Sequence, residues 1–207
     1  MEFWESSFQS KQAMWGLEPA NTAIETAALF QREGLSNILI PGFGYGRNAK
    51  VFIDTGFLVT GIEISETAIS LAKKHYGVDI LVHHGAVVDM PYDKALYDGI
   101  FCYALVHLLD EVERAKLIGD CFSQLTVGGL MVFTAISKSA STYQQGQKVA
   151  KDTFLTQHGV RLFFYDQASI EEEFGPYGLL GSKEVQEPVK HAKGKLAQSF
   201  WQITCRK

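Results

Sequence analysis

The sequence predicts an α/β fold, in which helices cover both faces of a mostly parallel sheet of seven strands. Two observations support this prediction. Short apolar runs alternate with helical patterns over residues 38–135, as expected of parallel strands joined by crossover helices. Two later runs, 179–187 and 198–205, are joined by a connection that contains lysine and glycine, which predicts an antiparallel hairpin at the sheet edge. We therefore expect a doubly wound sheet that ends in a C-terminal hairpin.

Size, charge and cysteine content indicate a globular protein with a small-molecule partner. The chain has 207 residues, of which 46% are hydrophobic and 20% charged, as is ordinary for one α/β domain. A net charge of -4 without a basic block argues against a nucleic-acid partner. No apolar run approaches the ~20 residues that cross a bilayer, so no membrane partner is expected. Cys102, Cys121 and Cys205 are odd in number and far apart, and no signal peptide is evident, which predicts a cytoplasmic location.

The first 37 residues precede the sheet and are expected to be helical. Their aromatic and apolar side chains form two clusters: Phe3, Trp4 and Phe8, and then Met14, Trp15 and Leu17. Asn21 is the expected N-cap of a helix over 22–33, which Gly34 ends. The aromatic residues either pack this segment onto the core or cover a ligand pocket as a lid.

A glycine-rich turn follows the first predicted strand, residues 38–40. It contains Gly42, Gly44 and Gly46, and a helical pattern begins at Ala49. Glycines permit positive φ and let a ligand approach the backbone, while the free N–H groups of a helix start favour anionic or polar ligand groups. The alternative is a βα turn that contains glycines but binds nothing.

The next predicted strand, residues 57–63, ends on an acidic side chain. Glu63 lies seventeen positions after Gly46, close to where the carboxylate of a nucleoside-binding βαβ unit accepts hydrogen bonds from ribose hydroxyls. Ser65 and Glu66 open the next helix, which places Glu63 at the carboxyl edge of the sheet, where ligands of such sheets bind. The alternative is a solvated strand end.

The middle of the chain continues the alternation. The expected elements are a helix over 66–76 capped by Gly77, a strand at 80–82, a strand at 97–103, a helix over 111–125 closed by Gly128 and Gly129, and a strand at 130–135. His83 and His84 could suggest a metal site, but neighbours on a strand point to opposite faces and no third ligand has a useful spacing. No metal is predicted.

The last 70 residues break the alternation. Residues 137–158 are polar, include Tyr143, and are expected to form an irregular or helical insertion. Residues 160–165 are apolar and aromatic, and Asp166 is the expected cap of a helix over 167–174.

These features together resemble the class I S-adenosylmethionine-dependent methyltransferases, over nearly the whole length. The resemblance rests on the glycine motif at 39–46, the strand end at 59–65, Met90-Pro91 followed by Tyr97-Asp98, the Gly128-Gly129 pair and the terminal hairpin. Trp4, Trp15-Gly16, Pro19 and Arg47-Asn48-Ala49 look most similar to the small-molecule branch that contains tellurite-resistance and thiopurine methyltransferases.

The resemblance implies a Rossmann-like fold and a site for S-adenosylmethionine. It divides one domain into an N-terminal helical lid (1–37), a cofactor-binding half (38–135) and a substrate-side insertion with the hairpin (136–207). The implied cofactor-binding residues are Pro41, Gly42, Gly44, Gly46, Glu63, Ile64, Ala86, Val87, Tyr103 and Ala104. Trp4, Trp15 and Tyr143 are expected to cover the cofactor or contact the substrate.

Three positions depart from the pattern of the family. Ile40 replaces an acidic residue before the glycines, and Ala86 stands where an Asp or Asn often contacts adenine, although Asp89 is nearby. Ser7 aligns with an arginine of the N-terminal aromatic motif. Cofactor binding is still expected, with polar contacts that differ in detail.

Methyl transfer from a sulfonium needs little covalent assistance, because alignment of the reactants and exclusion of water supply much of the acceleration. If the acceptor has to lose a proton, His107 and Tyr103 are the best candidates for a general base. His107 could instead make structural hydrogen bonds. Two other functions stay open: a nicotinamide-dependent oxidoreductase, disfavoured by Arg47 where its fingerprint has glycine, and a cofactor-binding protein without turnover.

Overall fold

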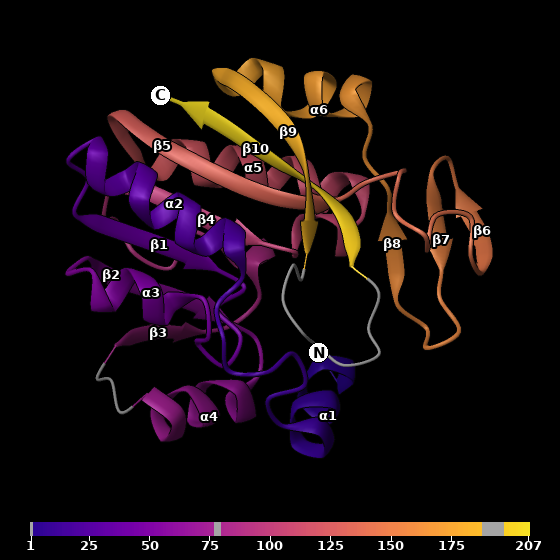
Figure 1. Cartoon of the computed structure of the whole chain (residues 1–207), viewed down its shortest axis with the longest axis horizontal. Coiled ribbons are helices and arrows are strands. Elements are labelled where there is room, and N and C mark those ends of the chain that lie inside the picture. Colours follow the sequence, from indigo (N-terminus) through magenta and orange to yellow (C-terminus); the bar gives the residue numbers. More distant parts are fainter. Residues whose placement is uncertain (1, 77–79, 188–196) are drawn as a thin grey trace.

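The computed structural model describes residues 2–76, 80–187 and 197–207 (Figure 1). The helices are α1 (Glu2–Lys11), α2 (Asn21–Arg32), α3 (Ala49–Asp54), α4 (Glu66–Tyr76), α5 (Glu111–Gln124) and α6 (Gln167–Phe174). The strands are β1 (Asn37–Pro41), β2 (Leu58–Glu63), β3 (Leu81–His84), β4 (Tyr97–Tyr103), β5 (Leu125–Ile136), β6 (Gln147–Ala150), β7 (Thr153–Leu155), β8 (Arg161–Phe163), β9 (Leu179–Glu187) and β10 (Gln198–Arg206). Most lie within a residue or two of the predicted positions.

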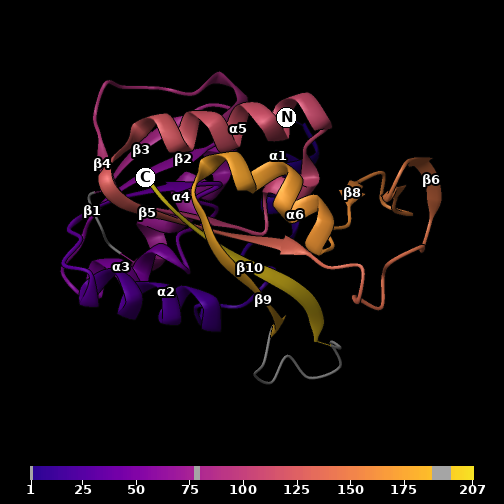
Figure 2. The same cartoon turned by 90° about the horizontal axis from the view of Figure 1, so that it is seen from above.

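The main sheet confirms the predicted fold class. Its seven strands have the order β3-β2-β1-β4-β5-β10-β9. The first five strands in sequence pair in parallel, and β10 is antiparallel to both β5 and β9. Figure 2 shows α2 and α3 on one face of the sheet and α5 and α6 on the other. The strand order reverses between β1 and β4, so their carboxyl ends flank the crevice where such sheets bind ligands.

The core lies on both faces of the sheet because alternate residues of the central strands point in opposite directions. On one face Phe52 packs between Phe30 and Phe101, at ring distances of 6.0 and 5.3 Å. On the other, Phe133 packs on Phe174 at 5.2 Å. The three cysteines are buried free thiols. No helix in the described ranges is long and apolar enough to cross a membrane.

Two predicted boundaries are wrong. Asn21 is not the N-cap of α2 but lies inside it; the cap position is Ala20, which makes no side-chain capping bond. The Thr22 N–H is instead bound by Glu187, a residue far away in sequence. β5 begins at Leu125, before the glycine pair that was expected to close the preceding helix, because the backbone continues through Gly128 at a φ of 84°. The predicted Gly77 cap and most of the connection between β9 and β10 lie outside the described residues.

The insertion after β5 is irregular over residues 138–146, as predicted, but the part that follows forms strands, which the prediction missed. Strands β6, β7 and β8 form a separate antiparallel sheet of three strands. Each strand has only three or four residues, and all four residues of β6 are exposed, so the apolar alternation that would reveal a strand is missing. In Figure 1 this small sheet projects from the side of the main sheet where β5 ends.

Candidate active site

The glycine turn joins β1 to α3 in a conformation that requires its glycines. Gly42, Gly44 and Gly46 have φ values of 70°, 59° and 82°, in the left-handed region. The N–H groups of Gly42 and Phe43 donate to the Ile62 carbonyl at 3.0 and 2.9 Å, which closes the turn against β2. No heavy atom of the described residues lies within 4 Å of the point where a Cβ on Gly44 would sit. At Gly44 the turn therefore presents bare backbone to open space, as close approach of a ligand requires.

Glu63 ends β2 beside this turn and is 6% exposed. Its Oε2 accepts the Gly44 N–H at 2.6 Å, and its Oε1 accepts the Ser65 N–H at 2.9 Å. Burial raises the pKa of Glu63, while the backbone N–H groups favour its ionised form. The Ile64 N–H is a third backbone donor, and a carboxylate has about four lone-pair sites, so Glu63 keeps the capacity for a further donor such as a sugar hydroxyl. The structure thus brings Glu63 and the glycine turn into direct contact.

The residues predicted to surround adenine follow the adjacent strands β2 and β3. Ile64 comes directly after β2 and is partly buried; Val87 opens the 3₁₀ turn Val87–Asp89 after β3 and is buried. The Gly85 N–H donates to the Glu63 carbonyl at 2.9 Å, which anchors the loop after β3 beside the end of β2. Ala86 follows in that loop. These residues therefore gather on the same stretch of the carboxyl edge.

The neighbouring histidines His83 and His84 have separate partners. His83 Nε2 lies 3.0 Å from Asp93 Oδ2, and His84 Nε2 lies 3.2 Å from the Ile64 carbonyl. Across the residues that the structure describes, no three His, Cys, Asp or Glu side chains are grouped so that they could hold a metal ion.

Tyr103 and Ala104 lie at the end of β4, across the switch point from Glu63. The Tyr103 ring stacks on Phe200 at 6.4 Å, and the Arg47 guanidinium lies 5.6 Å from its centre. Burial, together with the nearby Glu187 carboxylate, raises the pKa of Tyr103 to about 12. Its phenol is therefore protonated at neutral pH and is not a general base in this state. Ala104 has a φ of 52°, unusual for a residue with a side chain.

His107 lies in the 3₁₀ turn Val106–Leu108 and is buried. Its Nδ1 accepts the Ile136 N–H at 3.2 Å. Burial lowers the pKa of His107 to about 3. The ring is therefore neutral near pH 7, with its proton on Nε2, and neither nitrogen is free to take a proton from an acceptor. This geometry argues against the predicted role as a base and favours the structural alternative.

The N-terminal helix α1 packs against α4. The Glu5 carboxylate accepts hydrogen bonds from Ser65 Oγ, at 2.6 Å, and from the side chain and backbone of Thr67 at the start of α4. These bonds, that from Ser65 foremost, lower the pKa of Glu5 to about 2. Because Ser65 N–H is also bonded to Glu63, α1 is attached within two residues of the predicted ribose-binding carboxylate.

Residues 15–20, which link α1 to α2, are held by the residues that follow Gly44. Tyr45 Oη donates to the Gly16 carbonyl at 2.7 Å, and Arg47 Nη1 donates to the Glu18 carbonyl at 3.0 Å. Asn48 Oδ1 accepts the backbone N–H of the last linker residue at 2.9 Å. The residues after the glycines therefore hold the linker between α1 and α2 in place beside the glycine turn.

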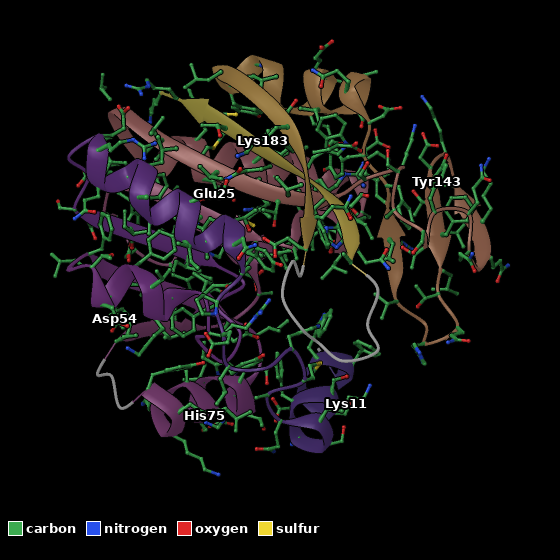
Figure 3. The ribbon with its side chains drawn as sticks, in the orientation of Figure 1. Lys11, Glu25, Asp54, His75, Tyr143 and Lys183 are labelled. Atoms are coloured by element: carbon green, nitrogen blue, oxygen red, sulfur yellow. The ribbon has the colours of Figure 1, made fainter. Side chains whose placement is uncertain are left out.

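Of the three predicted lid or substrate residues, two lie together. Trp15 stacks on Tyr45 at 6.1 Å and is 46% exposed, and Trp4 lies 6.3 Å from Trp15. Tyr143 is elsewhere. Its ring packs on Phe154 in the small sheet, and Figure 3 places it away from Lys11 at the end of α1.

Glu187, which the sequence did not indicate, is the last residue of β9 and is 2% exposed. Its Oε1 accepts the Thr22 N–H at 2.9 Å, which satisfies the start of α2. β9 runs antiparallel to β10, and β10 antiparallel to β5, so β9 ends at the carboxyl edge. The predicted hairpin is the one sequence signal that could have brought Glu187 to this edge.

Comparisons with known proteins agree with this geometry. A family model described as a methyltransferase domain matches residues 38–129. The ubiquinone biosynthesis O-methyltransferase of Coxiella burnetii is 26% identical over 110 residues, which are 52% of this chain and 46% of the relative. A Geobacillus protein named as a methyltransferase is 27% identical over 63% of this chain and 48% of its own length. The chain thus spans about half the length of the curated relatives it matches.

Two solved structures share the fold at low sequence identity. The 1,6-didemethyltoxoflavin N1-methyltransferase of Burkholderia thailandensis, solved with S-adenosylhomocysteine, has a TM-score of 0.73 and 16% identity, covering 98% of this chain and 84% of that one. TehB from Haemophilus influenzae has a TM-score of 0.68 and 17% identity, covering 99% and 67%. Residues 38–129 are therefore similar to a methyltransferase domain, and the chain shares the fold of these two solved structures, in agreement with the fold that the sequence resemblance implies.

Proposed function

We propose that this protein transfers a methyl group from S-adenosylmethionine to a small-molecule acceptor. The observation that carries the proposal is the contact between Glu63 and the Gly44 N–H, next to open space in front of bare glycine backbone. A ribose would donate its hydroxyls to the Glu63 carboxylate, while the main chain at Gly42 and Gly44 would face the methionine portion. The matched methyltransferase domain contains all of these residues.

The donor group fits the residues present on this edge. Ile64 and Val87 supply apolar contacts where adenine would lie, and Glu63 supplies a buried acceptor for a diol. When bound, S-adenosylmethionine supplies an activated methyl on a cationic sulfur. The protein would then contribute alignment of the acceptor with that methyl and exclusion of water.

The acceptor side would work by placement rather than by proton transfer. Tyr103, protonated and flanked by Phe200, would form an aromatic wall and position the acceptor. His107, with Nδ1 engaged by Ile136, would hold β4 and β5 together beneath that wall. An acceptor that attacks through a neutral nitrogen or an already ionised atom suits such a site, because it needs no strong base in the enzyme.

The N-terminal segment would act as a lid. Glu5 attaches α1 at the start of α4, Trp15 stacks on Tyr45 beside the glycine turn, and Trp4 packs on Trp15. Closed in this position, the segment would shield a bound sulfonium from water. We propose the division into residues 1–37, 38–135 and 136–207 on the same grounds.

Two further parts of the proposal concern environment and alternatives. Three buried free thiols suit a reducing compartment, so we propose the cytoplasm, with neither nucleic acid nor membrane as partner.

An oxidoreductase is the weaker candidate, because Arg47 occupies the place of the glycine in its fingerprint. A binding protein without turnover has the same cofactor site, and only an assay separates it from the enzyme.

Parallel calorimetric titrations with S-adenosylmethionine and NADH, followed by a screen for transfer of labelled methyl to small molecules, test the proposal. We expect binding of S-adenosylmethionine at micromolar order, no binding of NADH, and label in at least one low-molecular-weight product. Binding of NADH alone would contradict the proposal. Cofactor binding without transfer to any acceptor would favour the binding protein, and salt-sensitive binding to DNA or RNA would contradict the small-molecule assignment.

A further inference from the structure

We propose that Arg47 binds the carboxylate of the methionine portion of the cofactor; this inference rests on the proposed function. Arg47 comes directly after Gly46, at the end of the turn that would face that portion. Its guanidinium lies over the Tyr103 ring, 5.6 Å from the centre, and so reaches from the glycine turn across to the end of β4. The two elements between which the reacting end of the cofactor would lie are therefore bridged by a cation.

The charge of Arg47 is not neutralised within the described part of the chain. No carboxylate there lies within 4.0 Å of its guanidinium, whereas Lys138 is paired with Asp152 and Asp166. Its protein acceptors there are neutral: the carbonyls of Glu18 at 3.0 Å and Trp15 at 3.5 Å, both bound by Nη1, and the side chain of Tyr103. A guanidinium has five N–H donors in a planar fork, so donors are left for a bidentate anion.

The surroundings favour an anion over a further protein contact. Tyr45, Tyr76 and Tyr103 all lie close enough to the Arg47 charge for it to lower their pKa values, against the larger effect of burial. Partial burial among these rings weakens solvent screening and strengthens attraction to a carboxylate. The proposed cofactor has one carboxylate, on its methionine portion, and a sulfonium and an ammonium group that a guanidinium would repel.

The hydrogen bonds from Arg47 to the carbonyls of Trp15 and Glu18 give it an alternative, purely structural role. They hold the linker between α1 and α2, so loss of the side chain could loosen the lid without any direct contact with cofactor. Asn48 holds the same linker through the Ala20 N–H at 2.9 Å and has no charge. Asn48→Ala is therefore a matched control, which perturbs the linker but leaves the guanidinium in place.

The test is a calorimetric cycle with two ligands that differ only in the carboxylate, S-adenosylmethionine and decarboxylated S-adenosylmethionine. The full-length wild type should bind the first about 10- to 100-fold more tightly. Arg47→Ala should lose most of this preference by weakening the first ligand alone, and Arg47→Lys should retain part of it. Asn48→Ala should weaken both ligands to the same extent, and thermal unfolding should confirm that each variant is folded.

Each other outcome overturns the inference. An Arg47→Ala variant that binds both ligands less tightly by the same factor would show that Arg47 acts through the linker. An Arg47→Ala variant that binds both ligands as tightly as the wild type would show that Arg47 does not bind the cofactor. An anionic group of the acceptor would then be the remaining ligand for its charge. A wild type that binds both ligands with equal affinity would contradict the inference about Arg47 alone. A wild type that binds neither ligand would contradict the proposed function itself.

Discussion

The two halves of the sheet's carboxyl edge both contain a buried ionisable side chain, but they use it differently. On the proposed nucleoside side, Glu63 accepts hydrogen bonds from Gly44 and Ser65 and keeps the capacity for a ligand donor. On the proposed acceptor side, Nδ1 of His107 accepts the Ile136 N–H, and burial keeps the ring neutral. The first half is organised for recognition through hydrogen bonds. The second supplies packing and shape.

This difference suggests how the work of the site is divided. Reaction with an activated methyl needs a strongly held donor and an acceptor placed in line with it, so polar precision is most valuable on the nucleoside side. Tyr103 and Phe200 can position an acceptor without changing protonation state. Variants on the nucleoside side should therefore change cofactor affinity, and variants on the acceptor side should affect stability or turnover.

The largest expected effect on binding comes from Gly44→Val. Its φ of 59° is strained for a β-branched residue, and the new side chain would fill the open space in front of the turn. We expect cofactor affinity to fall about 100-fold in a folded protein. Gly56→Val is the matched control, since Gly56 also has positive φ and open space but lies after α3, away from the site. If both variants bind cofactor like the wild type, the turn is not part of the site.

Removal of residues 1–18 tests the lid. Phe8 packs with Tyr45, Ala68 and Leu71, in a cluster separate from the main core, so the rest of the chain should still unfold cooperatively. We expect weaker cofactor binding and loss of most turnover, because water would enter and the acceptor would be less constrained. Thermal unfolding and calorimetry measure both properties. An unfolded product refutes the lid, and so does a folded product with unchanged affinity and activity.

A milder change at the same segment is Glu5→Gln. The uncharged amide has one acceptor oxygen in place of the two that accept bonds from Ser65 and Thr67, so α1 should be held less firmly at the start of α4. We expect cofactor to dissociate a few-fold faster, with little change in the melting temperature, because Glu5 is near the surface. Stopped-flow release of cofactor measures the rate. An unchanged rate would mean that α1 does not open through this contact.

The smallest expected effect on function comes from His107→Gln, which keeps an acceptor for the Ile136 N–H. The pKa of His107 is lowered from 6.5 to about 3, so between these values the unfolded chain binds a proton that the folded chain does not. Stability should therefore fall as the pH is lowered through this range, by up to ~1.4 kcal/mol per pH unit from this residue. Denaturant unfolding at several pH values should show a flatter dependence for the variant. A pH–rate profile that loses an ionisation near neutrality in His107→Gln would restore His107 as a base.

The same contrast between halves explains what could be predicted from the sequence. Glycines and a strand-end carboxylate reflect local requirements of the backbone, so the glycine turn, the place of Glu63 at the carboxyl edge and the order of the main elements could be predicted from spacing. Glu5, Glu187 and Arg47 act through contacts with distant segments, and a single sequence contains no record of such pairings. The small sheet around Tyr143 was missed because its strands are short and β6 is exposed on every residue. The two roles left open for His107, base or structural residue, could not be separated from the sequence, because burial, which fixes its protonation state, is a tertiary property.

The most direct test of the central claim is titration of S-adenosylhomocysteine into the wild type and Glu63→Gln. This substitution keeps the shape of the side chain and removes the charge that a ribose diol would bind. We expect the wild type to bind at micromolar order and the variant to lose about 1.5–3 kcal/mol, or about 10- to 100-fold in affinity. Equal affinities in two folded proteins would contradict the assignment of Glu63 and the glycine turn as the cofactor site.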